Sequence, residues 1–389
     1  MRIAKCMSRL GTETAFEVLA RAKALEAQGR EIIHLEIGEP DFDTPANVVE
    51  AGVKALRAGY THYSPSPGIA ELRTEIARHV AATRHIDVSP DQVVVTPGAK
   101  PIMFFSILAL CEPGDEVVYP NPGFPIYESM INFVGATPVP APLRESRQFR
   151  LDVDELAGLV NDRTKLIIVN SPGNPCGGVL TKSDLAAIAD VARKHDAVVL
   201  ADEIYSEIIY EGEHHSITGF PGMPERTILL DGFSKTYAMT GWRLGYGVFP
   251  PELAPHITRL VTNSVSCTPA FTQWAGVEAL TGPQDAPRRM VEEFRRRRDV
   301  LVAGLNAIPG LHCELPAGAF YAFPNVQGTG LECRAFADRL LYEAGVATLA
   351  GTSFGKHGEG FVRLSYANSV ENLQKALDRI DTLVRKLRA

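Results

Sequence analysis

The chain has 389 residues, of which 45% are hydrophobic and 22% charged, a balance that excludes wholesale disorder and allows a large buried core. At roughly 150 residues per domain, this length predicts two or three domains. The formal net charge of −7 offers no basic surface to follow a phosphate backbone, so it disfavours a main role in nucleic-acid binding.

Residues 1–6 lack the apolar core of a signal peptide, so we expect a cytoplasmic protein. The most apolar stretch, residues 102–111, is far shorter than the roughly 20 residues that a membrane span needs. The six cysteines are scattered, with no C-x-x-C pair and no spacing typical of zinc ligands. We therefore expect reduced thiols, no membrane helix and no metal site.

Residues 1–46 are expected to form an N-terminal segment that packs with the C-terminal domain. The spacing of apolar residues predicts an amphipathic helix over 14–28. The apolar run 32–36 predicts a short strand, and the turn residues 38–40 follow it.

Residues 47–284 are predicted to form a large α/β domain. Between about 90 and 250, short β-branched runs alternate with helical patterns. Near-continuous apolar runs are typical of strands covered on both faces, and helices between them predict right-handed crossovers in a mostly parallel sheet. The predicted strands lie at 92–95, 116–119, 166–169, 197–200, 227–230 and 244–248.

Residues 285–389 are predicted to form a smaller α+β domain, with long charged helices at 286–307 and 369–387 and short strands at 319–323 and 360–364. The first helix contains four consecutive arginines, 295–298, which we expect on a solvated face. His214 and His215 follow an acidic turn, where a surface position is favoured over metal binding.

Ligands of open α/β sheets bind beyond the carboxyl ends of the strands, so the polar segments that follow the apolar runs are candidates. They lie at 96–100, 170–175, 202–205 and 231–236. In the first segment, Ala99 and Lys100 open an apolar helix, whose free N–H groups and dipole favour an anion such as phosphate. A plain turn before a helix explains the same residues.

Three charged residues in these regions suggest chemistry. Asp202 ends a buried strand, where an ionised carboxylate needs a cationic partner such as a protonated ring nitrogen, although a helix N-cap is the simpler alternative. Lys235 lies on the next such turn, and Arg243 follows eight residues later with a planar fork of donors that suits phosphate. An exposed surface lysine is the alternative for Lys235.

The segment 234–246, with Lys235 in its second position, resembles the lysine signature of class I pyridoxal-phosphate-dependent aminotransferases. Six further segments match that family in order over nearly the whole chain, at 38–42, 63–68, 121–125, 174–175, 202–205 and 361–365. The resemblance is closest to the bacterial aspartate aminotransferase-like subgroup. It implies fold type I, with a mostly parallel seven-stranded sheet in the large domain and a smaller α+β domain.

The resemblance implies that Lys235 forms a Schiff base with pyridoxal 5'-phosphate and that Asp202 pairs with the ring nitrogen. A protonated ring is the electron sink that lets a Cα–H bond break. Asn174 and Tyr205 would hydrogen-bond the phenolic oxygen of the cofactor, and Phe124 would stack on the ring, although Phe124 could also be a core residue. Lys235, Asp202 and Tyr205 are thus the expected catalytic residues.

The family also implies a phosphate site made by Arg243 and the amides of Ala99 and Lys100, with Ser234 or Thr236 as candidate hydroxyl donors. Tyr63 would reach this site from a second subunit, in a homodimer with shared active sites; an ordinary interface aromatic is the alternative. Many relatives have a phosphate-binding serine three residues before the lysine, whereas this chain has Gly232.

Arg363 would bind the α-carboxylate of the substrate bidentately, assisted by Asn174 and the backbone of Gly38. A strand-edge ion pair is the alternative for Arg363. Cys176 stands where relatives usually have threonine, and a small buried residue is favoured over a reactive thiol. The region 266–269 has no arginine that could bind a substrate side-chain carboxylate from the partner subunit, so the substrate stays open.

The implied reaction moves an amino group between an L-amino acid and a 2-oxo acid, aspartate-type or similar, by a ping-pong mechanism. A β-lyase, decarboxylase or oxidase on the same scaffold stays open, since a fold does not determine its chemistry. A non-catalytic regulator usually carries a fused DNA-binding module, for which we find no room here.

Overall fold

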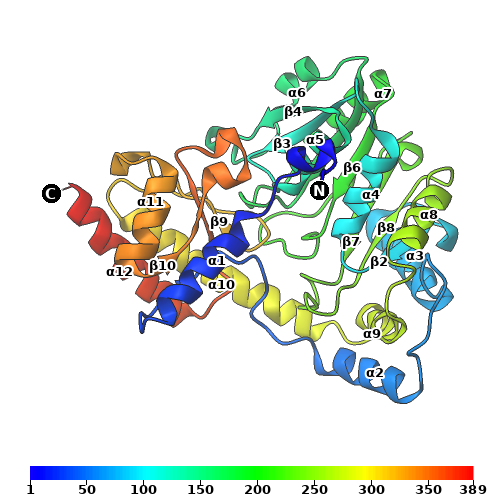
Figure 1. Cartoon of the computed structure of the whole chain (residues 1–389), viewed down its shortest axis with the longest axis horizontal. Coiled ribbons are helices and arrows are strands. Elements are labelled where there is room, and N and C mark those ends of the chain that lie inside the picture. Colours follow the sequence, from blue (N-terminus) through cyan, green and yellow to red (C-terminus); the bar gives the residue numbers. More distant parts are fainter. Residues whose placement is uncertain (389) are drawn as a thin grey trace.

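A seven-stranded sheet forms the centre of the larger lobe in the computed structural model, which describes residues 1–388 (Figure 1). All its strands are parallel except β8, which is antiparallel to both neighbours. In sheet order the strands are β2 (Val93–Thr96), β8 (Gly245–Val248), β7 (Thr227–Gly232), β6 (Val198–Asp202), β5 (Thr164–Asn170), β3 (Glu116–Asn121) and β4 (Thr137–Pro142). The predicted mostly parallel sheet is therefore confirmed.

Helices cover both faces of this sheet, because alternate strand residues pack into different hydrophobic clusters. One face packs against α4 (Lys100–Leu110), α5 (Ile126–Val134) and α8 (Ala254–Ser264). The other packs against α3 (Ala70–Arg84), α6 (Val153–Leu159), α7 (Lys182–Lys194) and α9 (Ala270–Thr281), and α2 (Ala46–Arg57) lies against α9. Both faces are apolar, which explains why the strands are near-continuous apolar runs.

The edge strand β4 was not among the predicted strands, because its sequence Thr-Pro-Val-Pro-Ala-Pro contains three prolines. The prolines occupy alternate positions, while the N–H groups of Thr137 and Leu143 donate to the β3 side. An edge strand needs donors on one side only, so prolines at the alternate positions are tolerated there.

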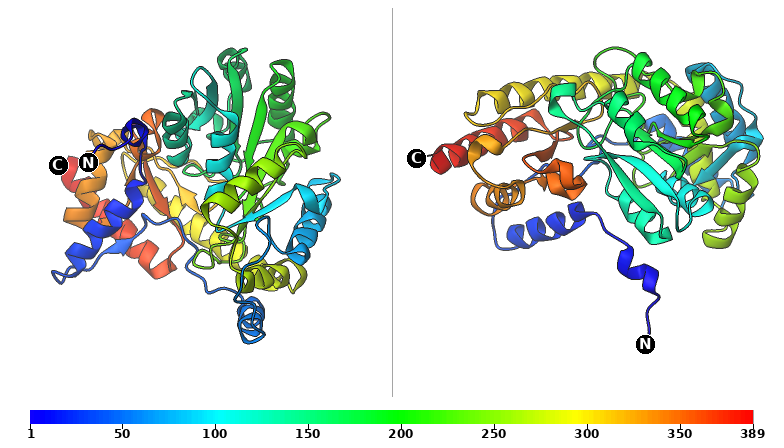
Figure 2. Two further views of the ribbon diagram at one scale, coloured as in Figure 1. Left: turned by 45° about the vertical axis from the view of Figure 1, so that its right-hand side comes forward. Right: turned by 90° about the horizontal axis from the view of Figure 1, so that it is seen from above.

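The smaller lobe is built from the C-terminal part of the chain and the N-terminal helix (Figure 2). Strand β1 (Ile33–His34) pairs in parallel with β10 (Val346–Ala347). A second sheet has the antiparallel order β11 (Leu349–Ala350), β12 (Val362–Ser365) and β9 (Tyr321–Ala322). The helices are α1 (Thr14–Glu26), α10 (Asp285–Ala307), α11 (Cys333–Arg339) and α12 (Val370–Arg388).

The expectation of a solvated face for the arginines of α10 is wrong for two of the four. Arg297 is 7% exposed and Arg298 is 2% exposed. Arg297 pairs with Asp41 at 2.6 Å and with Glu293 at 2.9 Å, while Arg298 donates to the carbonyl of Pro316 at 2.9 Å. Each guanidinium group can be buried because it donates to an acceptor on another part of the chain. These hydrogen bonds compensate for the hydration that the group loses.

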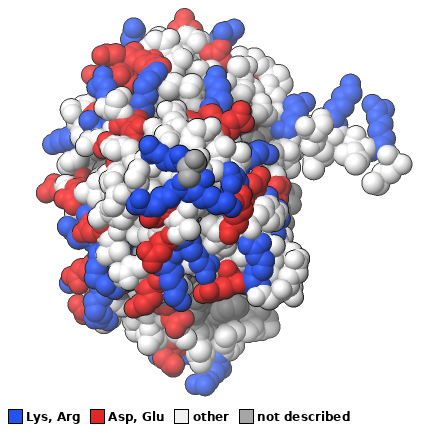
Figure 3. Space-filling view, turned by 90° about the vertical axis from the view of Figure 1, so that its left-hand side faces the viewer, with Lys and Arg blue, Asp and Glu red and all other residues white. Residues whose placement is uncertain are grey.

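His214 is also more buried than expected. Its side chain is 13% exposed, and its Nε2 lies 2.9 Å from a carboxylate oxygen of Glu203. Within residues 1–388, no group of three His, Cys, Asp or Glu side chains is arranged to hold a metal ion, and no helix is long and apolar enough to cross a membrane. Figure 3 shows acidic and basic side chains interspersed over the face of the smaller lobe.

Candidate active site

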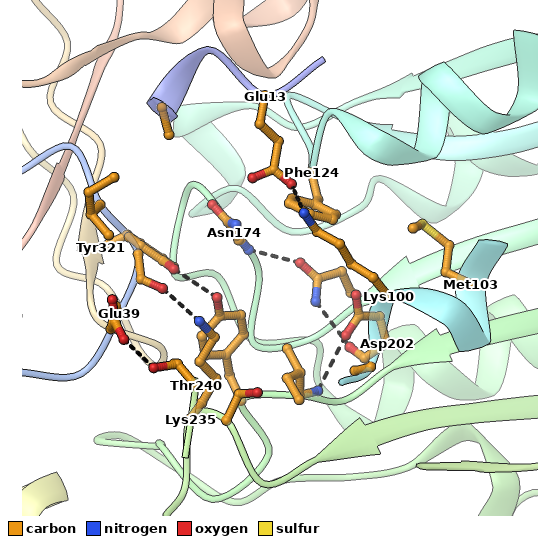
Figure 4. Close-up of a pocket in the computed structure, with 18 of the residues that line it drawn as sticks. Glu13, Glu39, Lys100, Met103, Phe124, Asn174, Asp202, Lys235, Thr240 and Tyr321 are labelled. Carbon is orange, nitrogen blue, oxygen red and sulfur yellow. Dashed lines mark hydrogen bonds and ion pairs between the residues drawn. The ribbon is translucent and has the colours of Figure 1, made fainter. Parts of the chain in front are cut away.

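A cavity of about 470 Å³ opens at the carboxyl ends of β5, β6 and β7, where the two lobes meet. The predicted site residues that line it come from both lobes and from the N-terminal segment; they are Gly38, Ala99, Lys100, Phe124, Asn174, Asp202, Tyr205, Ser234, Lys235, Arg243 and Arg363. Tyr63 does not line it, and its side chain is 91% exposed. Segments far apart in the sequence thus converge on one cavity (Figure 4).

Lys235 lies just after β7 and points across the cavity to the N-terminal segment (Figure 4). Its Nζ donates to the carbonyl oxygen of Gly38 at 2.6 Å. Among residues 1–388, no carboxylate lies within ion-pair distance of this amine. Burial lowers the pKa of Lys235 to about 8, with the more distant Glu39 acting in the opposite direction. At pH 7 roughly a tenth of the amine is therefore neutral and able to act as a nucleophile or base, far more than for an ordinary lysine.

Asp202 lies at the end of β6 and is 7% exposed. Its carboxylate accepts hydrogen bonds from the Tyr127 hydroxyl at 2.5 Å and from the backbone N–H of Ile204 at 3.3 Å. Burial raises the pKa of Asp202 to about 6, although the bond from Tyr127 acts to lower it. No lysine, arginine or histidine of the described chain forms an ion pair with Asp202, so its carboxylate is available to a cationic group of a ligand.

Asn174 is positioned by its neighbours after β5. Its backbone N–H donates to the side chain of Asn170 at 2.8 Å, and the Asn170 amide donates in turn to the carbonyl of Asp202 at 3.0 Å. This chain of bonds holds the loop after β5 against the end of β6, so that both side chains reach the same cavity.

Tyr205 forms a hydrogen bond with Tyr321, with the two hydroxyl oxygens 2.7 Å apart. Burial, together with Tyr321, raises the pKa of Tyr205 well above its ordinary value, so its hydroxyl stays protonated. Gly38 packs against the same pair, because a Cβ there would lie 2.2 Å from the Tyr321 hydroxyl. One hydroxyl donates to the other, so the fixed pair has one O–H left to donate into the cavity, which is that of Tyr205 when Tyr321 is the donor.

Arg363 on β12 is 4% exposed and has no acidic partner among residues 1–388. Its guanidinium donates to the carbonyl of Glu36 at 2.5 Å and to the Asn174 side chain at 3.1 Å, and it lies 4.5 Å from the centre of the Tyr321 ring. Its Nε is buried without a partner. A buried cation with donor capacity left over is suited to bind an anionic ligand.

A second group of predicted site residues lies at the N-terminus of α4. The amides of Ala99 and Lys100 open this helix, and Ser234 and Arg243 line the cavity beside them. Gly98 has φ of +85°, and a Cβ there would meet the Arg243 guanidinium at 2.1 Å. The glycine thus lets Arg243 approach the helix terminus, where the helix dipole and free N–H groups favour a phosphate.

Several residues that complete the cavity were not predicted. Tyr127 and Tyr321 belong to apolar segments and resemble core residues in the sequence, and only their hydroxyl contacts distinguish them. Glu13, Phe16 and the rest of the N-terminal segment come from far away in the chain, so no local pattern could place them at the cavity.

The family model described as aminotransferase class I and II matches residues 30–380. The chain is 42% identical to an aspartate aminotransferase of Pyrococcus abyssi over 92% of both chains. It is 41% identical to aromatic-amino-acid aminotransferase 2 of Thermococcus litoralis, over 92% of this chain and 94% of the relative. A solved aspartate aminotransferase from Thermus thermophilus with maleate superposes with a TM-score of 0.94 at 39% identity, over 98% of this chain and 100% of the other.

Proposed function

Because the chain belongs to the class I and II aminotransferases, it moves amino groups between an amino acid and a 2-oxo acid, and we propose that it does so with pyridoxal 5'-phosphate held covalently by Lys235. The family and reaction predicted from the sequence are confirmed. The relatives support this reaction rather than a lyase, decarboxylase or oxidase.

The observation that carries the proposed cofactor is the buried Asp202 without a cationic partner in the described chain, in the same cavity as Lys235. A protonated pyridine nitrogen would supply the missing positive charge. The phosphate would lie against Arg243, Ser234 and the amides at the start of α4. When bound, the cofactor supplies a cationic ring that accepts the electron pair released as the substrate Cα–H bond breaks.

The remaining contacts of the cofactor are proposed from the same cavity. Tyr205 and Asn174 carry donors that would reach the phenolic oxygen, and the Phe124 ring lines the cavity where it could stack on the pyridine. Tyr205 is held for this purpose by its bond to Tyr321.

Lys235 would act as the base that removes and returns the substrate proton. Its low pKa leaves part of the amine unprotonated at neutral pH, and its bond to the Gly38 carbonyl holds the nitrogen inside the cavity. Arg363 would bind the substrate α-carboxylate through its free donor capacity and thereby orient the Cα–H bond towards Lys235.

We also propose a homodimer with shared active sites. Tyr63 is almost fully exposed in the single chain, and Tyr60 and Val265 are large apolar side chains exposed at 44% and 42%. In a dimer these exposed side chains could be covered by the partner, and Tyr63 could then complete the phosphate site of a second copy.

A panel of amino donors tests the reaction. With pyridoxal phosphate supplied, the protein should convert each accepted amino acid to its oxo acid in multiple turnovers only when a 2-oxo acid acceptor is present, because the amino group must be passed on. Without an acceptor, a single turnover per site is expected. Multiple turnovers without an acceptor would contradict the proposed function, since a lyase or oxidase behaves in that way.

A further inference from the structure

The outer wall of the cavity contains an ion pair that the proposed chemistry does not use. Glu13, from the start of α1, pairs with Lys100, the first residue of α4, 87 positions away (Figure 4). Glu13 occupies the N-cap position of α1, yet its side chain accepts no hydrogen bond from that helix. Its carboxylate is thus directed into the cavity instead of capping its own helix. The Glu13 side chain is 16% exposed there.

The N-terminal segment holds Glu13 in this position from both sides. Before it, Arg9 donates to the carbonyls of Asn132 and Phe133 at 2.7 and 2.8 Å, and the Gly11 N–H donates to the Ser129 hydroxyl at 2.9 Å. These bonds attach the segment to the end of α5 in the larger lobe. After Glu13, helix α1 packs on the smaller lobe, so the carboxylate lies on the short connection between two anchored parts.

The other cations of the cavity already have proposed ligands. Arg363 would bind the α-carboxylate, Arg243 the phosphate and Lys235 the cofactor, which leaves Lys100 as the remaining basic side chain among the residues that line the cavity. Its ammonium lies 5.5 Å from the centre of the Phe124 ring, which is proposed to stack on the cofactor. Glu13 neutralises the charge of this ammonium. A substrate side chain near Lys100 would therefore contact a neutral ion pair, and the apolar side chains of Phe16 and Met103 line the same cavity.

We propose that Glu13 is a specificity-determining residue that disfavours substrates with a second carboxylate. This inference rests on the proposed function. A side-chain carboxylate would have to displace Glu13 from Lys100 and would then lie beside an unpaired negative charge in a partly desolvated cavity. An uncharged side chain of the same size leaves the ion pair intact. Glu13 thus favours amino acids with uncharged side chains over aspartate and glutamate.

The test compares substrates that differ in charge but not in size, namely aspartate with asparagine and glutamate with glutamine. In the holoenzyme, Glu13→Gln should raise the ratio of kcat/KM for the acid to that for the amide by about tenfold, because it frees Lys100 and removes the repulsion. The same change should appear without turnover as a tighter Kd for succinate relative to succinamate. Glu17→Gln, on an exposed position of the same helix, should leave both ratios as in the wild type.

The double variant Glu13→Gln/Lys100→Gln should not show the increased acid-to-amide ratio of kcat/KM, since no free ammonium remains for the second carboxylate. An unchanged or lower acid-to-amide ratio in Glu13→Gln would overturn the proposal. Failure of the proposed function gives a different result: the wild type would then convert none of the four amino acids, while the succinate and succinamate measurements would still report on Glu13.

Discussion

The Nζ of Lys235 donates a 2.6 Å hydrogen bond to the carbonyl oxygen of Gly38, which connects the loop after β7 with the N-terminal segment. Gly38 in turn packs so closely against the Tyr321 hydroxyl that it has no room for a side chain. Tyr321 shares a hydrogen bond with Tyr205. The carbonyl that accepts from the amine is therefore held in place by Tyr321 and, through Tyr321, by Tyr205.

The low pKa of Lys235 predicts how cofactor attachment depends on pH. Burial holds this pKa at about 8, and only the neutral amine attacks an aldehyde, so the reactive fraction increases as the pH rises through about 8. The initial rate of attachment to the apoprotein, followed by visible absorption over a pH series, should show a midpoint near that value. A midpoint at the ordinary lysine pKa of 10.5 would show that the amine is not desolvated.

Replacement of Asp202 should affect the rate more than cofactor binding. Asp202→Asn removes the negative charge that would keep the ring nitrogen protonated, and we expect turnover to fall by about a hundredfold or more, roughly 2.7 kcal/mol. Cofactor Kd should change by less than about tenfold, since the phosphate contacts remain. Tyr127→Phe, which keeps the carboxylate but removes its 2.5 Å hydrogen bond, should have a smaller effect on turnover. If turnover fell equally in Asp202→Asn and Tyr127→Phe, the negative charge of Asp202 would not be the cause.

The two arginines of the cavity should separate substrate from cofactor binding. Arg363→Lys loses the planar fork of donors, so the KM for the amino acid should rise by about tenfold or more with little change in cofactor Kd. Arg243→Lys should chiefly raise the cofactor Kd, with little change in the KM for the amino acid. Steady-state kinetics and cofactor titration measure both. If Arg363→Lys chiefly weakened the cofactor, its assignment to the substrate would be wrong.

Loss of Arg84, the cation of a buried ion cluster behind the cavity, should lower the free energy of unfolding. Arg84 bonds Glu203 at 3.0 Å and Asp231 at 2.8 Å, and its side chain is 1% exposed. Arg84→Met leaves both carboxylates without this cation, so the free energy of unfolding should fall by about 3–5 kcal/mol in denaturant titrations. If the free energy of unfolding fell by less than about 1 kcal/mol in Arg84→Met, the cluster would not be stabilising.

The same variant has a pH signature. Burial raises the pKa of Glu203, but His214 and Arg84 outweigh this and hold it at about 2, below the ordinary 4.5. The stabilisation from a lowered carboxyl pKa is fully present above the ordinary value and is lost as the pH falls from about 4.5 towards 2. The Glu203 part of the stability difference between wild type and Arg84→Met should therefore disappear between about pH 4.5 and 2. The Asp231 part should fall already near pH 7, because burial raises the pKa of that carboxyl to about 7 although Arg84 acts to lower it.

Much of the large lobe could be predicted because each strand is a short apolar run followed at once by polar residues. This pattern makes Asp202 and Lys235 candidates for the cavity, since the carboxyl ends of parallel strands meet at one edge, and the family resemblance favours this over an N-cap or an exposed lysine. Strand β4 could not be found in this way, because its prolines argue against a strand unless its edge position is known.

The rest of the site depends on contacts that have no local signal. Tyr321 and Tyr127 are aromatic residues in apolar segments, and their hydroxyl partners lie 116 and 75 positions away. The burial of Arg298 and His214 depends likewise on acceptors from other elements. A sequence pattern shows which residues are apolar, but not which polar atoms find a partner after folding.

The decisive experiment identifies the lysine that carries the cofactor. The holoenzyme is treated with borohydride, which makes the attachment permanent, then digested and analysed by mass spectrometry. We expect the added mass of the reduced cofactor on Lys235 alone. In Lys235→Ala, both this added mass and transamination should be absent. Modification of Lys100 instead, or a Lys235→Ala variant that still transfers amino groups, would contradict the assignment of Lys235.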